Sequence, residues 1–441
     1  MKITINSVTY TKLKSLSFSP EIDLTGNSLP INEFSADIIT TDTIAVGQFA
    51  RLYDDLDHLW ARYYITKVER QDRQTVRVLA RSLVALLDSI RLQAVRPTNW
   101  GLNDAIIYTF LPVDGGSIHG QDVQITYDSA LQNATITGYL PEQTARERLQ
   151  SILMAVGAYY VDFNMEYMAV RVIPGNEDPA QADPGTLIPI DKTFWKPRRT
   201  YRDPVSKVTV KYYELANRAA GDGERTIYYN GLTYAVTEAE MSLSNPNFEE
   251  GALPENEVVI ENNMLVNPNN ANAVLTAMAQ YYFNRDELEL DCVDNAEYWP
   301  GDLAICYADE DSMSTGIVQS AAFSFGLQAR AKLKIPATTA VESASLTVIY
   351  TCDDHEIARA AFTFPVGYGY TIQNPYLDLT GGSHRIIYRP TSATTSGTVA
   401  AGGSTVYVAC APALDMDLNA KELTVISVDS ATQDENGVVT I

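Results

Sequence analysis

The stretch NPNNANAVLTAMAQYYFNRDELELDC, residues 267–292, changes its hydrophobic period at its midpoint. In its first half, apolar side chains such as Val274 and Met278 recur at spacings of three and four, which predicts a helix over 269–285. The asparagines that precede this helix are residues that favour a cap position. Over 287–292, apolar and acidic side chains alternate, and this period of two predicts a strand.

A tight turn is predicted directly after this strand. It consists of Trp299, Pro300, Gly301 and Asp302, and we expect Trp299 and its neighbour Tyr298 to pack beside it. Alternation resumes over 303–307, which predicts a return strand, and a third strand is predicted over 316–325. One helix followed by three strands is the pattern of a compact β unit.

The first 80 residues show only strand and turn signals, which favours a sandwich or a small barrel. We expect Phe49, Tyr63 and Tyr64 to anchor the core of this first unit. Ser82 is expected to cap a short amphipathic helix that closes it.

Helix and strand signals mix in the middle of the chain. The clearest helix there is expected to begin at Pro141, a favoured first helical residue, and to end before Gly157. Two strands are predicted after it, over 159–163 and 168–172. A second strand-rich region follows, and the last hundred residues are rich in Thr, Ser, Ala and Gly.

The predicted fold class is therefore mainly β with an α+β insertion, built from two barrel or sandwich units and a small C-terminal β module. The predicted segments are an N-terminal β-barrel unit (1–95), an α+β insertion domain (96–200), a second β-barrel unit with helix 269–285 (201–336), a small β module (337–412) and a C-terminal extension (413–441).

The composition restricts the possible partners. The net charge is −23, so stable binding to nucleic acid is not expected, and the basic run 195–199 is interpreted as a solvated linker. No apolar run reaches the roughly 18 residues of a spanning helix, and the N-terminus alternates like a strand and lacks the apolar run of a signal peptide. The four cysteines are Cys292, Cys306, Cys352 and Cys410, which we interpret as buried thiols. For Cys352 and Cys410, at the ends of the first and last strands of the C-terminal module, pairing across neighbouring strands is the alternative.

A search for catalytic or metal-binding patterns yields none. The histidines are His58, His119, His355 and His384, and none has a partner at metal-ligand spacing. Paired acids such as 309–311 fall in predicted turns, and a nucleotide-binding glycine motif is absent from the sequence. We therefore expect no catalytic residue, no cofactor and no metal.

The order Asn-Pro, helix ending in Tyr-Tyr, strand, Pro-Gly-Asp, strand and Gly-x-Val resembles the C-terminal half of phage tail hub proteins, the prophage tail endopeptidase-like family, here without an evident peptidase site. The patterns at 47–52, 60–65 and 144–153 are similar to that family as well, so the resemblance covers roughly residues 1–335. It implies a structural tail hub or tail-tip protein that closes the distal tail tube. It also implies a homotrimer whose two β units per chain present six modules to a ring of tail tube or distal tail proteins. Contact with a baseplate, tip or spike protein is implied too, in a particle assembled in the bacterial cytoplasm.

Two alternatives remain open at this stage. The C-terminal module resembles the mucin-binding-protein repeat, although the acidic turn at 353–356 lacks that family's glycine. In a receptor-binding or glycan-binding protein, Tyr368, Tyr370, Tyr376 and Tyr388 would stack on a host-surface sugar. The second alternative is a cell-wall hydrolase whose catalytic groups come from distant positions, because a sequence does not show how far apart two carboxylates lie.

Overall fold

The structure is a computed structural model of the 441-residue chain. It describes residues 1–54, 57–110, 124–161, 167–173, 188–190, 197–248, 255–293, 298–307, 313–325, 329–367, 369–381, 384–417, 432–433 and 439–440. The described chain divides into two compact units, the larger within residues 1–339 and the smaller within residues 340–441. Strands dominate both units, and the predicted fold class, mainly β with a helix-containing insertion, is confirmed.

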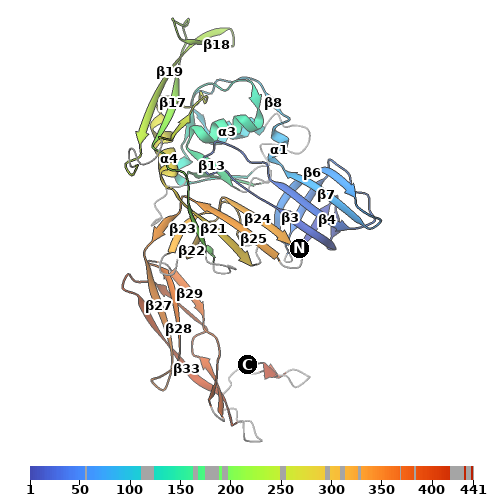
Figure 1. Cartoon of the computed structure of the whole chain (residues 1–441), viewed down its shortest axis with the longest axis vertical. Coiled ribbons are helices and arrows are strands. Elements are labelled where there is room, and N and C mark those ends of the chain that lie inside the picture. Colours follow the sequence, from blue (N-terminus) through green and yellow to red (C-terminus); the bar gives the residue numbers. More distant parts are fainter. Residues whose placement is uncertain are drawn as a thin grey trace. The chain divides into compact units, whose positions relative to one another are not determined.

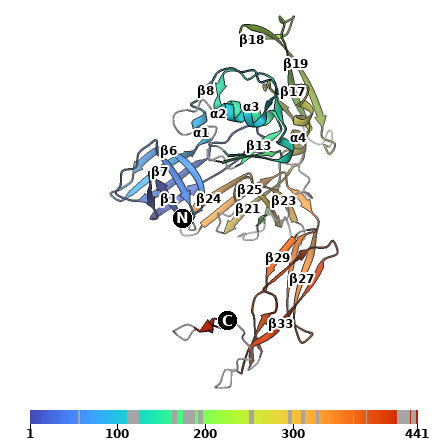
Figure 2. The same cartoon turned by 180° about the vertical axis from the view of Figure 1, so that it is seen from behind.

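One large sheet organises the larger unit (Figure 1). Its strands follow the order β16 (Arg198–Tyr201), β21 (Asp286–Val293), β25 (Ala329–Pro336), β24 (Ser320–Phe325), β3 (Leu13–Phe18), β4 (Glu33–Ile39), β7 (Thr75–Ser82), β6 (Leu59–Arg70), β5 (Phe49–Tyr53), β1 (Lys2–Ile5) and β2 (Val8–Tyr10). The first four strands in this order come from the second half of the unit and the other seven from the first 82 residues. Figure 2 shows the same sheet from behind.

The two predicted barrel units share this sheet, because β24 pairs antiparallel with β3 in the register Phe323 with Phe18. Alternate side chains along these strands face a common core that includes Phe18, Phe34, Leu288 and Phe323. Residues 1–95 and 201–336 therefore share part of one hydrophobic core.

A second sheet of the larger unit contains β15 (Ile188–Ile190), β22 (Leu303–Tyr307) and β23 (Met313–Ile317). The short strand β26 (Thr339–Val341) spans the boundary between the two units. The predicted return strand is β22, but it pairs with β23 and not with β21. The predicted third strand, 316–325, is likewise wrong as a single strand. It divides at Val318, whose N–H donates to Asp302 O at 3.0 Å, into β23 in this sheet and β24 in the large one.

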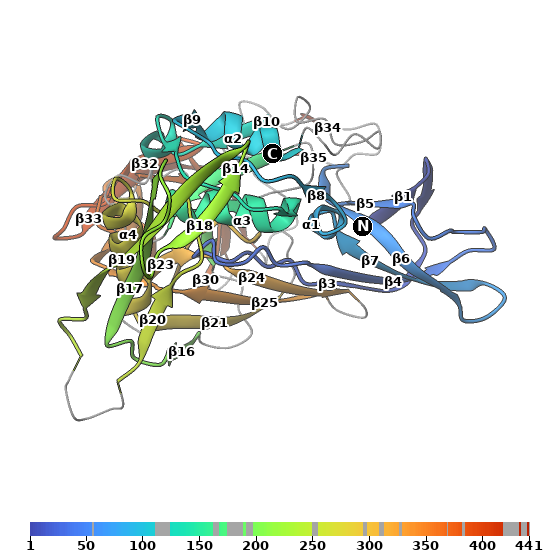
Figure 3. The ribbon, with the colours of Figure 1, turned by 90° about the horizontal axis from the view of Figure 1, so that it is seen from above.

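A third sheet carries a long hairpin, seen from above in Figure 3. Its order is β18 (Arg225–Tyr229), β19 (Leu232–Ser244), β17 (Lys207–Ala216) and β20 (Glu257–Ile260). The predicted helix 269–285 is α4 (Ala271–Phe283), which packs against β17 and β19. Asn270 occupies the N-cap position, but its side chain makes no hydrogen bond to the helix. The side chain instead accepts a hydrogen bond from Asn267 N–H and donates one to Ala155 O.

The predicted insertion contains helices over one small sheet. The helices within 96–200 are α2 (Leu102–Phe110), a 3-10 turn (Ser129–Leu131) and α3 (Ala145–Ala155), and the sheet has the order β10 (Gln124–Tyr127), β14 (Tyr167–Val172) and β13 (Ala158–Val161). The predicted N-terminal unit adds α1 (Val84–Leu87) and β8 (Arg91–Leu92), and β8 forms a short ladder with β12 (Gln143–Thr144) of the insertion. A second short ladder pairs β9 (Trp100–Gly101) with β11 (Thr135–Ile136). Its core continues into α4, through Val274 and Met278, and into β17. The insertion is therefore packed into the larger unit.

The smaller unit is a β module. One sheet has the order β28 (His355–Pro365), β27 (Ser343–Cys352), β33 (Ser404–Asp417), β31 (His384–Pro390) and β30 (Leu377–Gly381), and a second ladder pairs β29 (Gly369–Gln373) with β32 (Thr394–Thr398). A further short ladder pairs β34 (Thr432–Gln433) with β35 (Val439–Thr440). β33 runs five residues past the predicted module end at 412, because residues up to Asp417 still pair with β31.

Candidate functional site

The turn at 298–302 forms a joint between two parts of the larger unit. Trp299 N–H donates to Asp302 Oδ2 at 2.6 Å, and Asp302 N–H donates to Trp299 O at 3.0 Å, which closes the turn. Gly301 N–H donates to Val318 O at 2.8 Å, so the turn is tied to the segment between β23 and β24. Pro300 is buried beside it. The turn therefore lies between strands of two different sheets, β21 and β22.

Gly301 is required at this joint for two reasons. Its φ is +99°, a backbone conformation that side-chain-bearing residues rarely adopt. A Cβ at this position would lie 2.2 Å from Cγ1 of Val161, at the end of β13. The turn is thus in direct contact with the insertion.

Aromatic rings join the two halves of the large sheet. The Phe18 ring stacks on Phe323 with centroids 4.8 Å apart, and Trp299 stacks on Phe323 at 5.9 Å. Trp60 lies 6.0 Å from Phe18 and 6.5 Å from Trp299. Offset and tilted aromatic pairs of this kind stabilise beyond the area that they bury. Trp299 therefore packs between strands as well as beside its turn.

The three residues predicted to anchor the first unit divide between two cores. Tyr63 is 2% exposed and stacks on Phe34 at 5.0 Å inside the large sheet's core, and burial raises the pKa of its hydroxyl far above the usual range. Phe49 and Tyr64, which meet edge to face at 5.8 Å, pack against the core of the insertion. Consecutive residues of a strand point to opposite faces, which explains why Tyr63 and Tyr64 separate.

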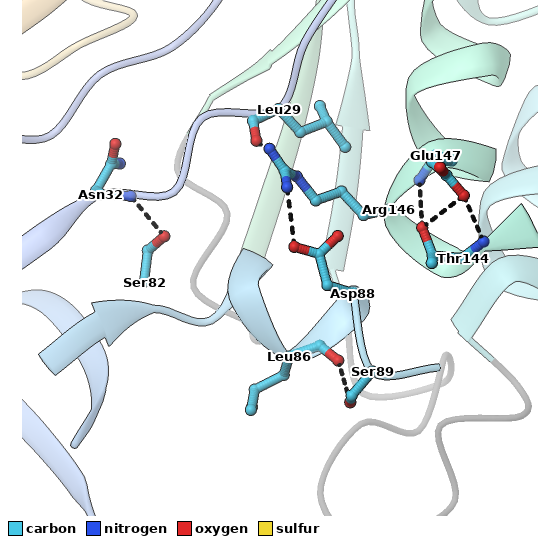
Figure 4. A network of polar contacts seen from close by, with 9 residues as sticks. All are labelled: Leu29, Asn32, Ser82, Leu86, Asp88, Ser89, Thr144, Arg146 and Glu147. Atoms are coloured by element: carbon cyan, nitrogen blue, oxygen red, sulfur yellow. Dashed lines mark hydrogen bonds and ion pairs between the residues drawn. The ribbon is translucent and has the colours of Figure 1, made fainter. Parts of the chain in front are cut away.

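A polar network fixes α3 to the N-terminal segment (Figure 4). Arg146 Nε donates to Leu29 O at 2.8 Å, and Arg146 Nη1 lies 2.9 Å from Asp88 Oδ2. The helix does not begin at Pro141: Thr144 is its N-cap, and Thr144 and Glu147 exchange backbone and side-chain bonds in a capping box. These bonds lower the pKa of the Glu147 carboxyl.

The predicted cap of α1 has a different role. The Ser82 hydroxyl accepts a hydrogen bond from Asn32 N–H at 3.0 Å, while Leu83 is the N-cap of α1 and makes no side-chain bond to it (Figure 4). Ser82 therefore holds the segment before β4 next to the end of β7.

The outward face of the large sheet carries ion pairs between neighbouring strands. Arg77 Nε lies 2.8 Å from Asp37 Oδ1, and Lys334 Nζ lies 3.1 Å from Glu287 Oε2. Two hydrogen bonds from Arg77 lower the pKa of the Asp37 carboxyl. This face accordingly alternates positive and negative groups across the strands.

The loop between β17 and β18 holds an ion pair, and the hairpin of β18 and β19 that follows it has an apolar tip. The Glu224 carboxylate accepts from Arg218 at 2.6 Å and from Gly221 N–H at 2.7 Å, and these contacts lower its pKa to about 2. At the tip, Tyr228 is 78% exposed and Leu232 is 46% exposed. We missed β19 in the sequence, although Asn230-Gly231 between two apolar runs is a strong hairpin signal.

The described tyrosines among those predicted to stack on a sugar differ in their exposure. Tyr370 is 6% exposed and its ring stacks on Phe364 at 6.3 Å, so the predicted sugar-facing role is wrong for this residue. Tyr388 is half-buried against the same core, whereas Tyr376 is 47% exposed. Tyr368 lies outside the described residues.

Among the residues that the structure describes, no three His, Cys, Asp or Glu side chains gather as a metal site. His58 Nδ1 lies 2.9 Å from Asp54 Oδ2 on the surface, while His119 and residues 309–311 lie outside the described residues. In the part of the chain that the structure describes, no helix is long and apolar enough to cross a membrane.

Comparison with known proteins places the fold. No family model and no curated protein matches the chain. Among solved structures, the chain is similar to the tail protein from Neisseria meningitidis MC58, with a TM-score of 0.53 and 12% identity over 76% of this chain and 95% of that one. The chain therefore has the fold of a tail protein.

Two further solved structures are more distantly similar. The 43 kDa tail protein of prophage MuSo2 from Shewanella oneidensis has a TM-score of 0.48 and 12% identity, over 76% of this chain and 97% of that one. A type VI secretion component of Escherichia coli, described as similar to the T4 tail proteins gp27 and gp5, has a TM-score of 0.43 and 10% identity, over 93% of this chain and 99% of that one.

Proposed function

We propose that the protein is a structural tail hub or tail-tip protein of a phage or phage-tail-like particle, where it closes the distal tube as a homotrimer. The observation that carries this proposal is the fold shared with the Neisseria tail protein over 76% of this chain. The joining of the two β units in one sheet supports it as well, because a component that docks on a ring must present its modules in a defined arrangement.

The proposed partners are a ring of tail tube or distal tail proteins on one side and a baseplate, tip or spike protein on the other. The trimer would contribute six β modules to this ring. Assembly would take place in the bacterial cytoplasm, and the protein would leave the cell within the particle. Co-expression with the tube protein, followed by electron microscopy, tests whether the chain occupies one end of the tube.

Size-exclusion chromatography with light scattering tests the trimer directly. A stable trimer of the full chain is expected at micromolar concentration, and a monomer under the same conditions contradicts the proposal. A variant lacking residues 340–441 is the matched control, because the proposed trimer contacts belong to the larger unit. This variant is expected to remain trimeric.

The negative net charge bears on how the proposed hub would interact with DNA. The chain carries 55 acidic and 32 basic residues, and in the proposed hub this excess lines the lumen or the outer face. An acidic lumen repels DNA, so that DNA passes without binding to the wall. A cryo-EM map of the particle with a basic channel wall contradicts this part of the proposal.

A role in host attachment through the smaller unit is the second candidate, and the exposed ring of Tyr376 favours it. Particles that lack residues 337–441 would then adsorb less to the host, while loss of a plain spacer leaves adsorption unchanged. We propose no catalytic activity, and a zymogram of the purified protein on cell-wall material tests this point.

A further inference from the structure

Cys352 and Cys410 occupy adjacent positions on two hydrogen-bonded parallel strands. β27 and β33 pair in parallel from Leu346 with Ser404 through Thr351 with Ala409. The next residue of each strand is a cysteine, so one more step in the same register places Cys352 beside Cys410. Neighbouring strands lie about 4.8 Å apart, which falls within the Cα separation of about 4.4–6.8 Å that a disulfide spans.

Both side chains point to the same face of the sheet. Two residues earlier, Tyr350 and Val408 are paired with each other and are 3% and 4% exposed in the core of the module. Because side chains alternate along a strand, Cys352 and Cys410 follow that pair on the inward face. Both are thiols in this structure.

The two thiols differ in access. Cys410 is 7% exposed, and its Sγ donates to Val408 O at 3.7 Å. Cys352 is only partly buried, because it ends β27 directly before the two-residue turn of Asp353 and Asp354. A reagent in solution therefore reaches Cys352 first.

We propose that Cys352 and Cys410 form a redox-dependent disulfide that joins β27 to β33 within the smaller unit. The oxidant is a low-molecular-weight disulfide. The Cys352 thiolate attacks one sulfur of this reagent, forms a mixed disulfide and releases one small thiol. The Cys410 thiolate then attacks Sγ of Cys352 and releases the second small thiol. The cysteine pair loses two electrons and two protons, and the reagent is reduced to two thiols.

The position of this bond defines its effect. β27 forms a hairpin with β28, and β33 continues past Cys410 into its pairing with β31. The disulfide ties these two parts of the sheet together covalently. In a reducing cytoplasm the pair stays as thiols, and in an oxidising medium outside the cell it closes. This inference is independent of the proposed tail function.

Peptide mapping of the full chain tests the proposal. Reduced native protein is incubated with glutathione disulfide, quenched with acid and digested without reductant. The reaction is run at mildly alkaline pH, because burial and Asp353 raise the pKa of the Cys352 thiol, and burial and Cys352 raise the pKa of Cys410. A peptide pair linked through Cys352 and Cys410 is expected, with loss of two of the four thiols. Cys292 and Cys306, at 0% and 2% exposure, are the internal control and should remain thiols.

Two variants test the two thiol–disulfide exchange steps separately. C410S should stop at a mixed disulfide between Cys352 and glutathione, whereas C352S should leave Cys410 unreacted. A wild-type protein that keeps glutathione on Cys352, or that forms dimers through Cys352, overturns the proposal. Peptide mapping of the wild-type protein tests the proposed disulfide even if a variant fails to fold.

Discussion

Replacing Gly301 with alanine should destabilise the larger unit by about 2–5 kcal/mol, and the structure supplies both parts of this figure. The backbone at Gly301 has a φ of +99°, and holding a residue with a Cβ in such a conformation costs about 1–2 kcal/mol. The new Cβ would also lie 2.2 Å from Val161 Cγ1, too close for two carbon atoms. Relieving this overpacking in a buried contact costs about 1–3 kcal/mol more.

Urea unfolding followed by tryptophan fluorescence measures this change. The four tryptophans of the chain, Trp60, Trp100, Trp195 and Trp299, all precede residue 340, so the signal reports the larger unit and not the smaller one. Trp299 is two residues from the substitution. The midpoint should fall while the slope of the transition stays the same.

Gly223 is the matched control, since its φ is +83° and a Cβ there would meet nothing within 4 Å. G223A should therefore show the backbone effect alone. Combining G301A with V161A should recover the overpacking part, which appears as a favourable coupling energy in the double-mutant cycle. If G301A unfolds like G223A, or if V161A shows no coupling, the proposed contact between the turn and β13 is refuted.

Three further predictions concern single contacts. T144A removes the cap of α3 and should lower the unfolding free energy of the larger unit by about 0.5–2 kcal/mol in the same urea assay. R77Q should lower it at pH 7, because the mostly buried Asp37 carboxylate loses its charged donor. Since the folded-state pKa of Asp37 lies below its unfolded value of about 3.9, this difference should shrink as the pH falls below that value and vanish once Asp37 is protonated in the folded state as well. Y370A should destabilise the smaller unit by about 3–5 kcal/mol in calorimetry, while Y376A should leave its transition unchanged.

Matched substitutions control these experiments. For T144A the control is T226A on the exposed face of β18, where no comparable loss is expected. For R77Q it is R81Q, because Arg81 and Glu33 form a longer and largely exposed pair at 3.5 Å. An R77Q effect that persists at a pH low enough to protonate Asp37 in the folded protein, or that R81Q matches, would show that the Asp37 charge is not its cause.

The sequence was sufficient to predict a helix or strand wherever the periodicity of that segment's own residues defines it. The helix predicted over 269–285 is α4, within two residues at each end, because its apolar positions follow the helical period. The strand predicted over 287–292 is β21 (Asp286–Val293) for the corresponding reason. Thr144 and Glu147 have the spacing of a capping box, so the sequence also contains the signal for the start of α3. We placed the start at Pro141 instead, because proline is a favoured first helical residue.

Pairing between distant segments has no comparable local signal. An alternating run such as 316–325 shows that its residues are extended, but not that the chain changes sheet at Val318. Nor does it show that β24 pairs with β3, which lies about 300 residues earlier in the chain. The same limit applies to Tyr63 and Tyr64, because alternation assigns them to opposite faces but does not tell which core lies on each. Among the candidate sugar-binding rings, Tyr370 was misjudged for this reason as well, since only the fold shows that it is buried.

The shared sheet affects how the proposed hub would dock. Backbone hydrogen bonds between β3 and β24, together with the stacked rings of Phe18 and Phe323, hold the two β units in one arrangement before any partner binds. Two modules joined by a flexible linker would have to be ordered when they dock on a ring, and that ordering subtracts from the binding free energy. Modules fixed in one sheet avoid this loss. In the proposed hub, the β3–β24 pairing would therefore act on assembly through pre-organisation, at residues that need not touch the partner.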